Sequence, residues 1–105
     1  MDRRINTRVV DTAGAALGTL IDEDASEIYW ISVSPQVLAT QGLIQIYDGF
    51  DAAGKLVWQL ESGFGLTHNF IPPITCNMGI YITTDDKIAC YSIAWRPLKW
   101  GKVLV

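Results

Sequence analysis

The sequence predicts an all-β chain that folds as an antiparallel β-sandwich or barrel. Seven or eight short runs are rich in β-branched and aromatic residues, and turn-forming residues separate them every roughly 8–12 positions. The 105 residues are enough for one domain. Half of the residues are hydrophobic and 18% are charged, so the chain is too apolar and too weakly charged for disorder. The pattern does not separate a jelly roll from an immunoglobulin-like topology.

The strand pattern also predicts which segments pair. A hairpin is expected where the loop 49–54, with a glycine at each end, separates two strand-like runs. A second hairpin is expected about the Asp85-Asp86 turn. Residues 11–20 are the only segment that suggests a helix, and their two glycines argue against one. Strands are expected at 4–10, 27–34, 43–48, 55–61, 66–71, 79–84 and 88–95.

The segment 55–61 has the most regular alternation in the chain. Leu56, Trp58 and Leu60 fall on one face, and polar side chains fall on the other. A period of two is typical of a half-buried strand. We therefore expect these three apolar side chains to face the core.

Charge is unevenly distributed along the chain. Residues 1–10 carry a net charge of +2 and residues 96–105 of +3, whereas residues 11–95 carry −8, which gives −3 in total. The basic ends either keep edge strands and tails soluble or form a docking surface for an acidic partner or another copy. The candidate interface residues are Arg3, Arg4, Arg8, Arg96, Leu98, Lys99, Trp100 and Lys102. Nucleic acid is not expected as a partner, because basic residues are few and the chain is acidic.

The last nine residues, 97–105, form an apolar and basic tail beyond the last expected strand. Pro97 interrupts strand pairing at the start of this tail. The tail either packs back on its own sandwich or forms an arm that adds to a neighbouring subunit, with Trp100 as the anchor. We therefore expect a single β-sandwich domain over residues 1–105, with a basic N-terminal strand and this tail.

Membrane anchoring and disulfide bonding are not predicted. The uncharged run 63–84 contains Pro72 and Pro73, so it is not a membrane-spanning helix. The N-terminus has basic residues without an apolar core behind them, so it is not a secretory signal. Cys76 and Cys90 are expected to be buried free thiols of a reducing cytoplasm, because the expected hairpin register sets them apart.

Catalysis is not predicted either. The single histidine, His68, is expected to play a structural part at a strand edge. The sequence has neither a serine-hydrolase signature nor a glycine-rich phosphate loop, so no catalytic residue is assigned. No cofactor and no metal is expected, because no pair of residues has the spacing of a zinc site. Asp48 and Asp51 flank a loop, but their spacing matches no calcium loop and turn formation is the favoured interpretation.

One compact group of side chains is a candidate ligand loop. Tyr47, Asp48, Phe50 and Asp51 lie at or beside the predicted hairpin loop. Exposed aromatic rings next to aspartates would suit a carbohydrate- or receptor-binding sandwich. The same residues also make an ordinary hairpin, so both interpretations stay open.

Two central segments, 44–58 and 72–81, carry a family resemblance. They contain a strand that ends in a Tyr-Asp-Gly turn, a Gly-Lys hairpin, a Pro-Pro-Ile run and a Cys-Asn-x-Gly-Ile-Tyr passage, with Gly-Phe-Gly at 63–65 between them. This pattern resembles small virion proteins of tailed bacteriophages. It covers about a third to a half of the chain and includes no catalytic residue, so no functional residue is carried over.

The resemblance implies a jelly-roll-like sandwich and a structural part in a phage particle. It implies a head decoration or cement protein of the virion, assembled in the host cytoplasm, with the major capsid protein or another virion protein as partner. Proteins of this kind form trimers or dimers at junctions between capsid subunits. The alternatives are a carbohydrate- or receptor-binding module and a trimeric fibre or spike component, which would bury the apolar tail along a threefold axis.

Overall fold

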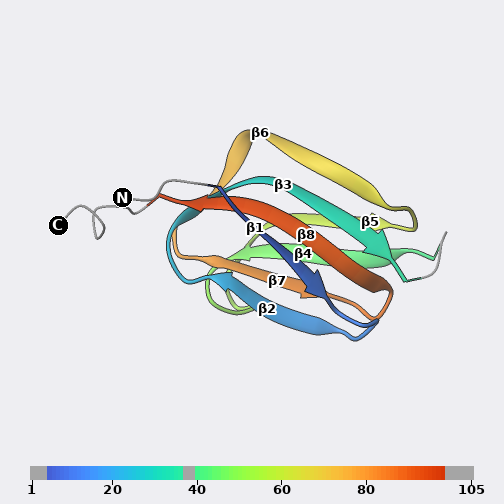
Figure 1. Ribbon diagram of the computed structural model, residues 1–105. Coiled ribbons are helices and arrows are strands. Elements are labelled where there is room, and N and C mark those ends of the chain that lie inside the picture. Colours follow the sequence, from blue (N-terminus) through green and yellow to red (C-terminus); the bar gives the residue numbers. More distant parts are fainter. Residues whose placement is uncertain (1–4, 37–39, 99–105) are drawn as a thin grey trace.

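Two packed antiparallel sheets make up the computed structural model, which describes residues 5–36 and 40–98 (Figure 1). These two ranges contain eight strands and no helix, so the predicted all-β sandwich is confirmed. Residues 11–20 form a turn and the start of a strand. The strands are β1 (Asn6–Asp11), β2 (Leu17–Asp22), β3 (Ser26–Pro35), β4 (Gly42–Asp48), β5 (Lys55–Ser62), β6 (Leu66–Cys76), β7 (Ile80–Thr84) and β8 (Ile88–Pro97).

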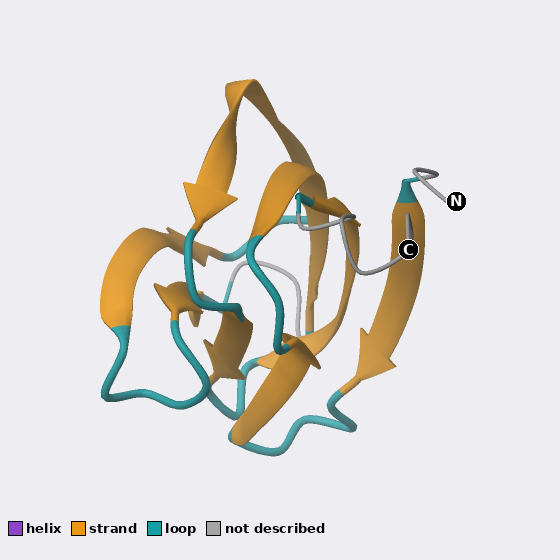
Figure 2. Cartoon of the chain, turned by 90° about the vertical axis from the view of Figure 1, so that its left-hand side faces the viewer, coloured by secondary structure: helices purple, strands orange, loops and turns teal. Residues whose placement is uncertain are grey.

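The strand order is that of a jelly roll. Sheet I has the order β1-β8-β3-β6, and sheet II has the order β2-β7-β4-β5. The nested pairs β1–β8, β2–β7, β3–β6 and β4–β5 are those of a long hairpin folded over on itself. Asn6 pairs with Trp95, so the start of β1 lies beside the end of β8. Figure 2 looks onto that end of the sandwich.

One of the two predicted hairpins is wrong. β4 and β5 do pair across the loop 49–54, but β7 and β8 lie in different sheets. Asp85 shapes the crossing between the sheets: its carboxylate accepts hydrogen bonds from the backbone N–H of Leu43 at 3.0 Å and of Lys87 at 2.9 Å. A short turn favours local pairing. Here, however, β7 pairs with β2 and β4, and β8 pairs with β1 and β3, all of them distant in the sequence. This arrangement buries the inner faces of β7 and β8 in the core between the two sheets.

β6 continues beyond its predicted end at Ile71. The strand runs through Pro72 and Pro73, although neither residue has a backbone N–H to donate. Proline is tolerated there because β6 is an edge strand and its pairing with β3 is interrupted between Asn69 and Ile74. Ile71 is 92% exposed as a result.

Inward-facing isoleucines from both sheets form the core. Burial of one such side chain stabilises a fold by about 1.5–3 kcal/mol. The buried isoleucines with at most 1% exposure are Ile28, Ile31, Ile44, Ile46, Ile80, Ile82, Ile88 and Ile93. Tyr91 and Cys76 are buried with them. Because side chains alternate between the two faces of a strand, the residues between these buried ones point to the outer faces of the sheets.

Aromatic contacts close the side of the sandwich where β5 and β6 are edges. The ring centroids of Trp58, His68 and Phe70 lie 5.2–5.5 Å apart. His68 is exposed, and its ring contacts those of Trp58 and Phe70 at the open side of the sandwich. At another point the sheets are joined by a side-chain hydrogen bond, in which Nε1 of Trp95 donates to Asp22 at 2.8 Å.

Both cysteines are free thiols, as predicted, but only Cys76 is fully buried, and the hairpin register behind the prediction is wrong because β7 and β8 do not pair. Cys76 is buried at the end of β6, and Cys90 is half-buried in β8. Burial raises the pKa of the Cys76 thiol to about 12, and the nearby charge of Asp48 adds to this rise. Cys76 therefore stays protonated at neutral pH and is a poor nucleophile there.

Buried Tyr91 makes the fold sensitive to alkali. Burial raises the pKa of its hydroxyl to about 12, while Thr19 and the Arg8 charge offset part of the rise. The unfolded tyrosine ionises near pH 10, so the stability that Tyr91 contributes is complete below that pH and falls as pH approaches 12. Tyr91→Phe should remove this loss and gain about 1 kcal/mol over the wild type near pH 11. Urea unfolding at neutral and alkaline pH measures the difference.

Unfolding at neutral pH shows whether Tyr91→Phe disturbs the packing of the core. The Tyr91 hydroxyl has no hydrogen-bond partner of ordinary geometry among the described residues, so Tyr91→Phe should change stability by less than about 1 kcal/mol at pH 7. Tyr47→Phe, on the outer surface of sheet II, is the matched variant, because Tyr47 is not among the groups that shift the pKa of Tyr91. Equal alkaline losses in wild type and Tyr91→Phe would contradict this account.

Candidate functional site

Five of the eight predicted interface residues lie outside the described residues. These are Arg3, Arg4, Lys99, Trp100 and Lys102. The strands that lead to them are neighbours, because β1 pairs with β8 along its whole length. The expectation that the two basic segments share one surface therefore stays a prediction, and the described strands are compatible with it.

The other three predicted interface residues contact their own domain. Arg96 forms an ion pair with Glu27 at 3.2 Å, and its guanidinium lies 5.7 Å from the centroid of the Tyr29 ring. The backbone N–H of Leu98 donates to the carbonyl of Ala25 at 2.8 Å. The first residues of the tail are thus held on their own sandwich. Arg8 is exposed in the middle of edge strand β1, beside Ile93 of β8.

The predicted ligand loop is tied to the neighbouring turn by Asp48. Its carboxylate accepts hydrogen bonds from the backbone N–H of Asn77 at 2.9 Å and of Met78 at 2.8 Å. A longer bond of 3.4 Å comes from Gly79, whose carbonyl in turn accepts from Gly49 at 3.2 Å. Asp48 therefore organises the junction between β4 and the β6–β7 turn.

The remaining residues of the predicted ligand loop are spread around the hairpin. Asp51 accepts a hydrogen bond from the N–H of Ala53 at 2.9 Å, as expected for a turn-forming aspartate. Phe50 is 49% exposed in the loop. Tyr47 lies on β4 and its hydroxyl donates to Gln45 at 3.2 Å. Both carboxylates of the group thus accept hydrogen bonds from backbone N–H groups, Asp51 within its own loop and Asp48 from the β6–β7 turn.

An apolar row crosses the outer face of sheet II. Tyr81 of β7 lies between Leu20 of β2 and Tyr47 of β4, and Tyr47 pairs in turn with Leu56 of β5. We call these four residues the tyrosine row. The two leucines are 40% and 43% exposed, and both tyrosines are partly exposed. The row thus presents apolar surface to the outside on every strand of the sheet.

Gly18 makes room for one ring of the tyrosine row. A Cβ atom at this position would lie 1.9 Å from the hydroxyl oxygen of Tyr81, which no real contact allows. The Tyr81 side chain therefore lies across β2. The glycine that weakened a helix in the sequence pattern is required by this close approach.

Uncharged polar side chains lie beside the tyrosine row. Gln45 donates to Gln59 at 3.0 Å and accepts from Thr83 at 3.4 Å. Its oxygen also accepts the bond from Tyr47. This network holds the polar side chains of three adjacent strands in fixed positions, so the middle of the face combines apolar rings with neutral amides.

The position of Leu56 corrects the prediction for β5. Trp58 and Leu60 pair with inward-facing residues of β4, as expected. The register shifts between Ile46 and Tyr47, so that Val57 is an extra residue and Leu56 turns outward. The sequence pattern gave no signal for this bulge, and it therefore missed the tyrosine row.

Comparisons with protein-family models, curated proteins and solved structures give no match for this chain. Within residues 5–36 and 40–98, no three His, Cys, Asp or Glu side chains are grouped so as to hold a metal ion. The same ranges contain no helix that could cross a membrane. The outer faces of the two sheets are the remaining candidates for a functional surface.

Substitution of Asp48 tests whether its carboxylate holds the β4–β5 loop against the β6–β7 turn. Asp48→Ala removes the acceptor of two good backbone hydrogen bonds, so we expect a loss of about 1–3 kcal/mol in the free energy of unfolding. Asp51→Ala, which breaks one exposed local bond, should lose about 0.5 kcal/mol. Urea denaturation of both variants measures the difference. Equal losses would show that the junction does not depend on Asp48.

Proposed function

We propose that the chain is a non-enzymatic structural protein of a tailed-phage particle. In this proposal it is a capsid decoration or cement protein that self-associates and docks on the major capsid protein at subunit junctions. The observation that carries the proposal is the tyrosine row, an apolar stripe on the outside of an otherwise well-packed sandwich. The resemblance of segments 44–58 and 72–81 to small virion proteins supplies the setting.

The composition of the tyrosine row favours a protein partner. Tyrosine is enriched in protein–protein interfaces, and charged residues are depleted at their centres. Tyr47 and Tyr81 occupy the middle of the row, and the adjacent network of glutamines and threonine is uncharged. Bringing another protein onto this face therefore desolvates no charge at its centre.

A second copy of the chain suits the same face. A row that crosses four strands can meet its own counterpart around a twofold axis, since such an interface uses one patch twice. The chain has a net charge of −3, but the row keeps like charges away from the centre of contact. Self-association also adds stability to a small domain by mass action.

The two segments with the virion-like pattern lie together in the fold. One includes the β4–β5 hairpin and the other includes the β6–β7 turn, and Asp48 joins them by hydrogen bonds to Asn77 and Met78. The pattern thus corresponds to one corner of the sandwich. That corner lies next to Tyr47 of the tyrosine row. This proximity supports the proposal that the corner and the row contact the same partner.

Sedimentation velocity over a dilution series tests self-association. We expect a dimer or trimer for the wild type, and a shift to monomer in the double variant Leu20→Ser, Leu56→Ser because the exposed apolar surface is lost. Phe64→Ser is the matched control, since Phe64 is 62% exposed in the β5–β6 turn, outside the row. It should keep the wild-type mass.

Co-sedimentation with expanded and mature capsids of the encoding phage then tests docking. Wild type and Phe64→Ser should sediment with the capsids, and the double variant should stay in the supernatant. A monomeric wild type that sediments with neither form of capsid would overturn the proposal. An oligomer that survives the double substitution would overturn the assignment of the tyrosine row.

A further inference from the structure

A β-bulge turns one tryptophan of β3 onto the outer face of sheet I. Ile28 pairs with Trp95 of β8, and Trp30 pairs with Ala94, so Tyr29 is an extra residue in β3. Without this extra residue, Trp30 would face the core as Ile28 does. Bulges are over-represented next to active sites, where they re-aim a side chain. The half-buried indole of Trp30 is therefore displayed by a specific distortion of the strand.

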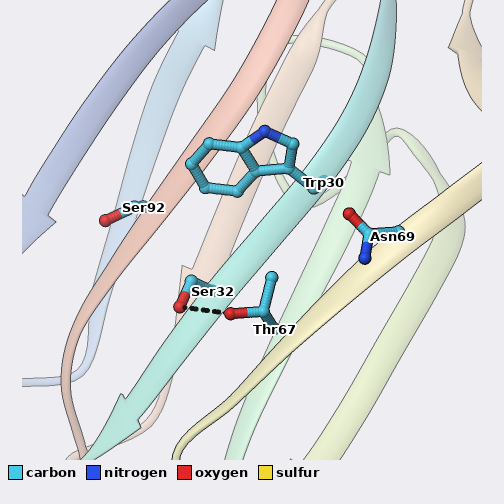
Figure 3. Close-up of a pocket in the computed structure, with 5 residues that line it drawn as sticks. All are labelled: Trp30, Ser32, Thr67, Asn69 and Ser92. Atoms are coloured by element: carbon cyan, nitrogen blue, oxygen red, sulfur yellow. Dashed lines mark hydrogen bonds between the residues drawn. The ribbon is translucent and has the colours of Figure 1, made fainter.

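The indole lies across the sheet between two shallow hollows. Figure 3 shows it extending from β3 toward β8, with Ser92 beyond it and Thr67 and Asn69 on β6 on its other side. One hollow has a volume of about 330 Å³ and is lined by Trp30, Ser32, Thr67, Asn69 and Ser92. Every residue in this lining is uncharged. The hollow thus combines one aromatic ring with hydroxyl and amide groups from three strands.

Several polar groups of the hollow are available to a ligand. Thr67 and Ser32 share one hydrogen bond of 3.0 Å, which leaves acceptor lone pairs on both oxygens. The amide of Asn69 and the hydroxyl of Ser92 have no side-chain partner among the described residues. Asn69 alone supplies two donors and one acceptor oxygen.

We propose that this hollow binds a neutral saccharide. The C–H groups on one face of a sugar ring match the negative face of the Trp30 indole, and its hydroxyls match the free donors and acceptors of Asn69 and Ser92. The lining of this hollow holds no cation for an acidic sugar or a phosphate, whereas the second hollow beside Trp30 and Ser92 is lined by Arg8. The site is distinct from the loop of Tyr47 and Phe50, and it does not depend on the tyrosine row.

Calorimetric titration with maltohexaose, cellohexaose and chitohexaose tests the proposal. At least one of these neutral probes should bind with a Kd between about 10 μM and 1 mM. Trp30→Ala should weaken that binding about tenfold, and Asn69→Ala about fivefold, as expected for loss of one ring contact and one hydrogen bond. Gln59→Ala, on the outer face of sheet II, should leave the affinity unchanged.

Additional variants and sedimentation measurements separate a loss of sugar binding from misfolding and from loss of self-association. Asn69→Ala and Ser92→Ala change single polar groups of the outer face, so they decide the matter if Trp30→Ala does not fold. All these variants should keep the wild-type sedimentation mass, whereas the tyrosine-row double variant should keep its sugar affinity. The proposal is overturned if no neutral probe binds at about 10 mM. It is also overturned if folded Trp30, Asn69 and Ser92 variants bind as wild type does, or if sialyllactose binds more tightly than every neutral probe.

Discussion

Burial of alternate side chains between the two sheets determines which residues each sheet shows to the outside. Eight buried isoleucines fix the register of β3, β4, β7 and β8, because a slip of one residue would expose them. The outer faces are then determined by what remains. Bulges break this alternation locally. One of them turns Trp30 outward in sheet I, and another turns Leu56 outward in sheet II. Both candidate surfaces follow from these departures.

Local signals in the sequence were enough to predict most strands and the β4–β5 hairpin. Alternating apolar residues and glycine-bounded turns act over a few positions, and they depend little on distant segments. The β7–β8 hairpin failed because a jelly roll pairs each of these strands with partners far away in the sequence. The continuation of β6 through Pro72 was missed because it depends on an edge position, which local sequence does not encode.

The candidate sites were harder to predict than the fold. A bulge exists only relative to a partner strand, so the outward positions of Trp30 and Leu56 had no signal in the pattern of their own strands. Asp51 was correctly recognised as a turn former, whereas the carboxylate of Asp48 accepts hydrogen bonds from a turn that is distant in the sequence. The role of the basic ends stays a prediction, since most of those residues lie outside the described ranges.

The two outer faces differ in the kind of contact they favour. Sheet II presents leucine and tyrosine surface, where removal of water supplies the driving force and directionality is low. Sheet I presents one indole among hydroxyls and an amide. Hydrogen bonds to such groups are directional, so they favour small neutral ligands with matching hydroxyls. We therefore propose protein contact on one side of the sandwich and sugar contact on the other.

Hydroxyl-radical footprinting of the wild-type protein at high and low concentration tests this assignment most directly. The account predicts that oxidation of Tyr47 and Tyr81 falls as the protein associates, because the tyrosine row becomes covered. Oxidation of Trp30 should stay constant with protein concentration and fall only when a neutral hexasaccharide is added. Protection of Trp30 on association, with both tyrosines unchanged, would contradict the account.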